Sequence, residues 1–178
     1  RVLAGVNPLT YLRKMREPIL VAFSTSSSGA TLPVTLRTVE HRIGVNNNVA
    51  SFAVPLGATV NMDGTAIMQG VATVFIAQFF GYDLGLNAYL MVILTATLAS
   101  IGTAAVPGVG LVMLTLVLDQ VGLPVEGIGL IIGVDRLLDM MRTVVNVTGD
   151  GTVSTIVAAS EGQLDRDVFA DPDAGRLV

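Results

Sequence analysis

The apolar stretches of this chain are short, and small polar residues interrupt them. The run TLASIGTAAVPGVG, from Thr97 to Gly110, is one such interruption between two strongly apolar arms. A helix needs about 20 mostly apolar residues to cross a bilayer, and only Ile128–Val147, which carries charges, has that length. Short apolar helices that end in small polar residues are typical of re-entrant hairpins and broken helices. Such backbone is stable at membrane depth only where protein or a water-filled cavity surrounds it.

Composition indicates that the solvent of this chain is a bilayer. Of the 178 residues, 52% are hydrophobic and 13% are charged, which is little charge for a water-soluble domain. The formal net charge of −4 is scattered along the chain, so we expect no nucleic-acid partner. The chain has no cysteine, which removes disulfide and thiolate chemistry. We expect a multi-pass protein of the plasma or inner membrane, and we expect this chain to be a fragment of it because it opens in mid-pattern.

The interruptions follow one another in a repeating order. Ser24–Pro33 is a Ser-rich tip between two helical arms, and Asn61–Thr65 interrupts the next helix. Ser100–Gly108 is a second tip, and the last helix is expected to break at NVTGDG, Asn146–Gly151. The order predicts an all-α membrane protein in which a re-entrant hairpin and a broken transmembrane helix occur twice. Paired interruptions of this kind point to the binding site of a secondary transporter.

Charges at the feet of the hairpins predict that the two units are inverted. The feet of the second hairpin are acidic and hold no Lys or Arg, whereas basic residues flank the first tip: Arg13, Lys14, Arg16, Arg37 and Arg42. Because cytoplasmic loops are enriched in Lys and Arg, the first hairpin is expected to enter from the cytoplasm and the second from outside. The tips would then meet near the middle of the membrane. Residues 1–162 are predicted to form the transport unit, and residues 163–178 a flexible cytoplasmic tail.

The last helix carries a stripe of polar residues. Asp135, Asp139, Arg142, Asn146 and Asp150 are spaced 4, 3, 4 and 4 residues apart, which places them within an arc of about 80° on a helix. A charged side chain at the bilayer centre costs about 2.5–3.5 kcal/mol, so four of them facing lipid would cost on the order of 10 kcal/mol. The stripe is therefore expected to face the protein interior. The alternative is an Asp–Arg pair that only joins helices, but the interruption predicted after the stripe favours a ligand site.

The residue types of the stripe and the tips fit an acidic amino acid. Arg142 offers a planar fork that matches a carboxylate, and Asp139 can receive an ammonium group. The tips supply hydroxyls and backbone N–H groups, and helix N-termini favour anions. Asn61, Asp63 and Asp150 would add hard oxygen ligands suited to Na⁺. We expect sodium as a coupling ion and no organic cofactor.

Four motifs in order resemble the glutamate transporter family, the dicarboxylate/amino acid:cation symporters. They are TSSSGATLP, PLGATVNMDGT, TATLASIGTAAVPG and DRLLDMMRTVVNVTGD, and the resemblance runs over about residues 7 to 162. It implies hairpin 1, helix 7, hairpin 2 and helix 8 of the transport domain, an arrangement with the inverted repeats known for this family. It also implies a homotrimer built on scaffold helices that lie upstream, with each transport domain moving past the scaffold in an elevator-like cycle.

The resemblance assigns substrate contacts to individual residues. Arg142 would hold the side-chain carboxylate of the substrate, with Thr65 nearby, and Asp139 would hold its amino group, assisted by Thr143. Asn146 and the first tip would hold the α-carboxylate, and the second tip would be a gate over the substrate. The full set of substrate residues is Ser26, Ser27, Ser28, Thr65, Val106, Gly110, Asp139, Arg142, Thr143 and Asn146.

The resemblance also implies three sodium sites. The first would be formed by the Asp150 carboxylate with the carbonyl groups of Gly57, Asn61 and Asn146. The second would rest on the carbonyl groups of Thr59, Ser100, Ile101 and Thr103. Asp63 and the side chain of Asn61 would contribute to the third, which an upstream helix would complete. Met62 would lie between the ion and substrate sites and couple them.

Departures from the family pattern bear on the substrate. Proton-coupled and C4-dicarboxylate members typically lack the carboxylates of Asp139 and Asp150, so both acids here favour sodium-coupled aspartate or glutamate symport. The alternative is a proton-coupled glutamate or C4-dicarboxylate carrier of the same family. Ser26 and Met140 occupy positions where some relatives carry an extra arginine, for which Arg136 is the candidate replacement. Ala105 replaces a glycine that relatives often have at the second tip.

Two function classes outside transport are less compatible with the stripe. An intramembrane enzyme could use Asp135 and Asp139 as a catalytic pair, but Arg142 on the same face would keep both acids ionised. An ion channel could build its filter from the hairpins. However, a single asymmetric site with one arginine fits a zwitterion better than a ring of equivalent ligands. We therefore predict a transporter and no enzymatic activity.

Overall fold

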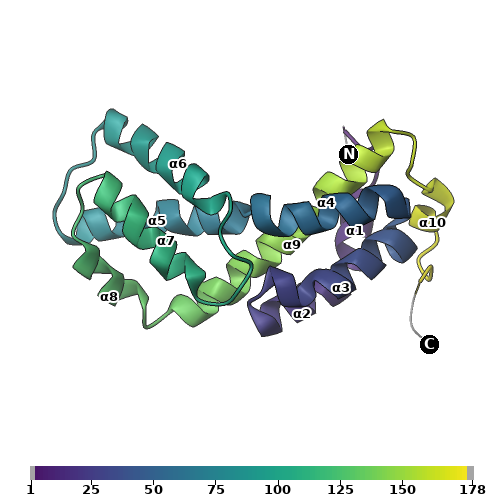
Figure 1. The fold of residues 1–178 in the computed structure, drawn as a ribbon, viewed down its shortest axis with the longest axis horizontal. Coiled ribbons are helices and arrows are strands. Elements are labelled where there is room, and N and C mark those ends of the chain that lie inside the picture. The colour runs from purple at the N-terminus through teal and green to yellow at the C-terminus, as the bar shows by residue number, and fades with distance from the viewer. Residues whose placement is uncertain (1–2, 176–178) are drawn as a thin grey trace.

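The computed structural model describes residues 3–175, and all regular elements within this range are helices (Figure 1). This confirms the all-α prediction. In chain order the elements are α1 (Pro8–Lys14), α2 (Arg16–Thr25), α3 (Ser28–Thr38), the π-helix η1 (Val39–Ile43), α4 (Asn47–Val60), α5 (Asp63–Phe79), α6 (Leu86–Ser100), α7 (Val109–Gln120), the 3₁₀-helix η2 (Val125–Gly127), α8 (Ile128–Ile131), α9 (Asp135–Ser160) and α10 (Arg166–Ala170).

The described structure is elongated, and α9 joins its two ends (Figure 1). Helices α1 to α4 and α10 lie at one end, and α5 to α8 lie at the other. Helices α4 and α5 follow one another along the long axis, and α9 packs on both of them as well as on α2 and α3. The polar stripe of α9 is thus covered by the elements that contain the predicted interruptions.

Three of the four predicted interruptions lie where the sequence placed them. Between α2 and α3, Ser26 adopts a left-handed conformation with φ of 52°, and the Ser27 side chain caps α3. Between α4 and α5, Asn61 and Met62 leave the helical conformation. Residues 101–108 connect α6 to α7. In each case short polar residues or glycine occupy the ends of the helices, where backbone N–H and C=O groups have no partner within the helix.

The predicted break at NVTGDG is wrong. Helix α9 runs without interruption from Asp135 to Ser160, and the chain is irregular instead at residues 132–134, between α8 and α9. The glycines serve close packing: a Cβ atom at Gly149 would lie 2.5 Å from Asn61 Nδ2, and one at Gly151 would lie 2.6 Å from Tyr11 Oη. Asp150 therefore lies on regular helix and not on unwound backbone.

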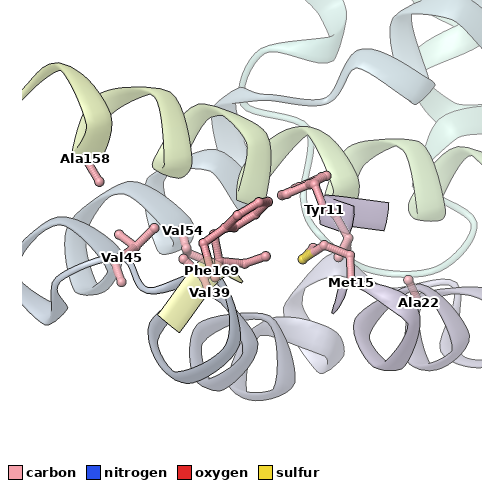
Figure 2. Packing of buried hydrophobic residues seen from close by; sticks show 11 residues of the cluster. Tyr11, Met15, Ala22, Val39, Val45, Val54, Ala158 and Phe169 are labelled. Atoms are coloured by element: carbon pink, nitrogen blue, oxygen red, sulfur yellow. The ribbon is translucent and has the colours of Figure 1, made fainter. Parts of the chain in front are cut away.

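The structure has a packed segment where the sequence predicted a flexible tail. After residue 162 the chain forms a bridge between Leu164 and Val45, and Asp165 caps α10. Phe169 of α10 is 8% exposed and belongs to the core cluster beside α9, where it is gathered with Tyr11 and Met15 (Figure 2). The predicted boundaries also include residues 1–2 and 176–178, which lie outside the described residues.

The hydrophobic core is divided between the two ends of the molecule. One cluster joins α1, α2, η1, α4 and α9 (Figure 2), and the other joins α5, α7 and α8 around Ile76, Leu114 and Leu118. Many large apolar side chains remain on the surface, including Phe52 at 70% and Ile93 at 62% exposure. An apolar surface this extensive marks contact with lipid or with other protein. Among residues 3–175, no helix combines the length and the apolar character that crossing a bilayer requires.

Candidate functional site

The polar stripe of α9 is buried, as the sequence predicted. Asp135, Asp139, Arg142, Asn146 and Asp150 are each at most 8% exposed. Buried charges are stable only when they are paired or hydrogen-bonded. The partners of these side chains therefore define what the stripe does.

Asp139 connects the arginine of the stripe to the second tip. Its Oδ1 atom lies 2.7 Å from Arg142 Nε and 2.6 Å from Arg142 Nη2, and its Oδ2 atom accepts a hydrogen bond from Gly108 N–H at 2.8 Å. The third nitrogen, Arg142 Nη1, is buried and has no hydrogen-bond partner among residues 3–175. An unsatisfied buried donor costs about 1–3 kcal/mol, and more when it is charged, so Arg142 Nη1 is available to an acceptor group of a ligand.

A cavity of about 10 Å³ lies between this pair and the two tips. The predicted substrate residues that line it are Ser26, Ser28, Thr65, Val106, Asp139, Arg142, Thr143 and Asn146. Besides Arg142 Nη1, the Oγ atom of Ser26 is also buried without a partner. The cavity is about the size needed for a single water molecule, so a larger ligand requires the surrounding elements to move.

Ser27 and Gly110 touch the site without lining the cavity. The Ser27 hydroxyl is directed to the Ala105 carbonyl of the second tip, at 2.7 Å. A Cβ atom at Gly110 would lie 1.2 Å from Arg142 Nη1, so the guanidinium rests directly on the backbone at the start of α7. The close approach explains why glycine occupies this position.

Sequence reasoning missed several residues that line the cavity. Ala104, Ala105 and Val109 line the cavity and were not predicted as substrate residues. Met62 and Thr103 also line it, but they were predicted only for coupling and for a sodium site, respectively. The second tip contributes a continuous segment of backbone, and its small residues gave no chemical signal of their own. The only indication in the sequence that these residues line the cavity was that they lie next to Val106 and Gly110, which were predicted.

Asn146 ties the stripe to the interruption between α4 and α5. Its Oδ1 atom accepts a hydrogen bond from Gly64 N–H at 2.7 Å, and its Nδ2 atom lies 3.2 Å from Met62 Sδ and 3.4 Å from Thr65 Oγ1. Nearby, the Thr143 hydroxyl donates to the Asp139 carbonyl at 2.8 Å. Thr143 therefore offers a ligand an acceptor, as an ammonium group requires.

The residues predicted for sodium form two neighbouring groups. In the first, Asn61 Nδ2 lies 3.2 Å from Asp150 Oδ1, and a Cβ atom at Gly57 would lie 2.7 Å from the same oxygen. In the second, the Thr59 carbonyl accepts a hydrogen bond from Gly102 N–H at 3.0 Å, which brings α4 to the second tip with its residues Ser100, Ile101 and Thr103.

Asp63 lies apart from both groups. It is exposed, and a Cβ atom at Gly149 would lie 3.2 Å from its Oδ2 atom. Within residues 3–175 no three His, Cys, Asp or Glu side chains cluster as they do in a transition-metal site. The oxygen atoms available here are carbonyl and carboxylate oxygens, which suit hard cations.

Comparison with known proteins assigns the family. The family model described as "Sodium:dicarboxylate symporter family" matches residues 1–160. The chain belongs to the sodium:dicarboxylate symporter family. This confirms the resemblance found in the four motifs.

Individual members of the family support the same assignment. The chain is 49% identical to an excitatory amino acid transporter of Caenorhabditis elegans and 50% identical to excitatory amino acid transporter 3 of Mus musculus, each over 151 residues. It is 47% identical over 165 residues to excitatory amino acid transporter 2 of Mus musculus. These alignments cover 85%, 85% and 92% of this chain but only 29–30% of the relatives. The chain thus spans less than a third of the length of these relatives, which are named as transporters and not as enzymes.

Proposed function

We propose that the protein that contains this chain transports aspartate or glutamate across a membrane by symport with sodium ions. The observation that carries the proposal is the buried Asp139–Arg142 pair, whose free Arg142 Nη1 donor adjoins a cavity lined by both tips. The chemistry of this pair matches both charge types of an acidic amino acid. The named relatives point to the same substrate class.

Substrate binding rearranges the contacts of the pair. The side-chain carboxylate of the substrate takes the Arg142 fork, including the Nη1 donor that is unused here. The ammonium group then compensates the Asp139 carboxylate, and Thr143 accepts a further hydrogen bond from it. Ser26 Oγ and the N-terminus of α3 receive the α-carboxylate, where the helix dipole favours an anion. Asn146 is held in place by Gly64, Met62 and Thr65, and Asn146, Met62 and Thr65 form the floor of the substrate site.

The second tip acts as the gate. A cavity of about 10 Å³ cannot hold an amino acid, so the segment 101–108 must move away to admit one. Val106 and Gly110 travel with this segment. Because Asp139 Oδ2 holds Gly108 N–H in the closed arrangement, a substrate that engages Asp139 acts directly on the gate.

The sodium ions bind to oxygen atoms of the protein beside the substrate and do not contact the substrate directly. Asp150 with the carbonyl groups of Gly57, Asn61 and Asn146 forms the first site, and the second tip with Thr59 forms another, while Asp63 and Asn61 contribute to a third. Met62 links the sodium sites to the substrate site. Its sulfur contacts Asn146 of the substrate site, and the residue itself follows Asn61 of the sodium sites in the chain. An ion that orders the interruption between α4 and α5 thereby orders the substrate floor, which couples the two binding events.

The architecture that we propose is the one that the family resemblance implies. The α2–α3 and α6–α7 pairs are re-entrant hairpins that enter from opposite sides of a plasma or inner membrane. The exposed apolar surface contacts lipid and the upstream scaffold, through which three subunits assemble. The unit described here then moves as one body in an elevator-like cycle.

Uptake of radiolabelled aspartate into vesicles that contain the full-length protein tests the proposal. We expect uptake with an inward sodium gradient and a loss of most of it when choline replaces sodium. Excess unlabelled glutamate should compete, and excess succinate should not, because succinate has no ammonium group for Asp139. Uptake that continues in choline would contradict sodium coupling and favour the proton-coupled alternative, and competition by succinate would favour a C4-dicarboxylate carrier.

A further inference from the structure

Hydrogen bonds at three points fasten the second tip to the other described elements. At its start, Gly102 N–H donates to the Thr59 carbonyl at 3.0 Å, and at its end, Gly108 N–H donates to Asp139 Oδ2 at 2.8 Å. In the middle, the Ala105 carbonyl accepts from Gly29 N–H at 3.1 Å and from the Ser27 hydroxyl at 2.7 Å. The middle point is the place where the two tips touch, and both of its donors come from the first tip.

Ser27 performs two tasks with one hydroxyl. Its Oγ atom accepts a hydrogen bond from Ala30 N–H at 3.1 Å, which caps α3, and it donates its proton to the Ala105 carbonyl. A hydroxyl that accepts from an N–H group at a helix N-terminus is polarised and becomes a better donor. Ser27 is 7% exposed, so water does not compete strongly for this bond in the closed arrangement.

Gly29 adds the second donor, its backbone N–H, and the absence of a side chain lets the second tip approach it closely. A Cβ atom at Gly29 would lie 3.2 Å from the Ala105 carbonyl oxygen and 3.6 Å from Ala105 Cβ. The first tip thus presents the Ser27 hydroxyl and the Gly29 N–H side by side to one carbonyl oxygen. The two donors belong to the N-terminus of α3, where unsatisfied N–H groups attract an acceptor.

We infer that Ser27 is a positioning residue that holds the second tip closed, and that its hydroxyl is not a substrate ligand. Ser26 and Ser28 line the cavity, whereas Ser27 does not, so its hydroxyl serves the contact between the tips. We call the Ser27 hydroxyl, the Gly29 N–H and the Ala105 carbonyl the latch. The inference rests on the proposed function in that it treats movement of the second tip as gating.

The latch stabilises the closed tip without locking it. A net gain of about 0.5–1.5 kcal/mol for one hydrogen bond corresponds to a shift of about 2- to 13-fold in an equilibrium. Loss of the Ser27 donor therefore shifts the tip toward the open arrangement by about fivefold, the middle of this range, while Gly29 N–H still holds the Ala105 carbonyl. The same donor has to be released each time the gate opens, which makes Ser27 a determinant of the opening equilibrium.

Three substitutions separate the latch from the helix cap. Ser27→Ala removes both roles. Ser27→Thr keeps both, because threonine caps helices and carries a hydroxyl. Ser27→Asp keeps the cap but removes the donor, because an ionised carboxylate only accepts hydrogen bonds. Since Ser27→Asp retains the cap, it also provides a test if Ser27→Ala fails to fold.

The test measures opening of the tip in the full-length protein without aspartate and in choline medium. The reporter is Thr103→Cys, whose parent side chain is 2% exposed and lines the cavity. This chain has no other cysteine, and any cysteine elsewhere in the protein is replaced by serine. We measure the rate at which a methanethiosulfonate reagent modifies the reporter, with Ser27 and with each of its three substitutions.

We expect Ser27→Ala and Ser27→Asp to raise the modification rate about fivefold and Ser27→Thr to leave it within about twofold. A parental rate in Ser27→Asp would overturn the inference, because the cap alone would then explain the residue. A lowered aspartate affinity in Ser27→Ala with an unchanged modification rate would also overturn it, because Ser27 would then be a ligand. No aspartate is present during the measurement, so a failure of the proposed substrate does not alter this outcome.

Discussion

At the scale of single residues, the free nitrogen of Arg142 is the most informative atom of the site. Folding buries the guanidinium and satisfies Nε and Nη2 through Asp139, yet leaves Nη1 without an acceptor beside the Gly110 backbone. Replacing the arginine removes the carboxylate fork and leaves Asp139 to pair with an ammonium group alone. The site would then fit neutral amino acids better than acidic ones.

We predict that Arg142→Cys lowers aspartate affinity by about 100-fold or more, since hydrogen bonds to charged groups contribute about 1.5–3 kcal/mol each. Uptake of neutral amino acids such as serine should rise relative to aspartate. The measurement is competition of unlabelled amino acids for uptake in vesicles. Arg136→Cys is the matched control, because Arg136 is exposed and its guanidinium donates a long hydrogen bond to the Ser24 carbonyl, at 3.4 Å.

The control should retain aspartate affinity within about twofold. High-affinity aspartate binding by Arg142→Cys would contradict the role of Arg142 as the carboxylate fork. An equal loss in both variants would show instead that Arg136 supplies the additional arginine that some relatives carry.

Burial of the stripe was predictable from the sequence, but its partners were not. The cost of charges in lipid forces Asp135, Asp139 and Arg142 inward whatever the fold, so spacing alone decided that point. The role of Ser27 depends on Ala105, which is 78 residues away in the chain. No local pattern distinguishes a serine that faces a cavity from a neighbour that faces another tip.

At the scale of elements, polar side chains explain the interruptions that were predicted correctly, and glycine explains the one that was wrong. Ser24–Pro33 and Asn61–Thr65 interrupt helices because their polar side chains compete for backbone groups. The glycines of NVTGDG were predicted to do the same, yet they lie within α9 and allow α1 and α4 to approach it. A glycine that breaks a helix and one that admits a neighbour look the same in a single sequence.

We predict that Gly151→Ala destabilises the protein by up to about 2 kcal/mol, because overpacking usually costs about 1–3 kcal/mol and the better helix propensity of alanine offsets about 1 kcal/mol of that cost. The new Cβ would lie 2.6 Å from Tyr11 Oη and 2.9 Å from Met15 Cε. Tyr11 cannot move freely, because its hydroxyl donates to the Thr148 carbonyl at 2.8 Å. The packing loss should exceed the gain of about 1 kcal/mol that alanine brings to a helix interior.

The measurement is thermal unfolding in detergent, with Gly70→Ala in α5 as the control. A Cβ at Gly70 meets no described atom within 4 Å, so this substitution should leave the unfolding temperature unchanged or raise it. An unfolding temperature of Gly151→Ala at or above that of the parent would show that close packing is not the reason for the glycine.

At the scale of the whole molecule, Lys14 joins the first and last described segments. The residue is 2% exposed, and its ammonium group donates to the carbonyls of Arg42, Val168 and Asp171 at 2.6–2.8 Å. These carbonyls lie near the C-terminal ends of η1 and α10, where the helix dipole favours a cation. The sequence indicated only a basic foot of the first hairpin and could not show that one of its cations is enclosed by the chain's own C-terminal segment.

We predict that Lys14→Met lowers the stability of the folded protein by about 3 kcal/mol or more, because three carbonyls lose their donor and each unsatisfied buried group costs about 1–3 kcal/mol. The loss should concentrate on the C-terminal segment, so trypsin should cleave after Arg166 faster than in the parent. Arg13→Met is the control, since Arg13 is an exposed neighbour on the same helix. If both variants are cleaved at the parental rate, the segment 163–175 is held by Phe169 and the apolar cluster and not by the Lys14 ammonium.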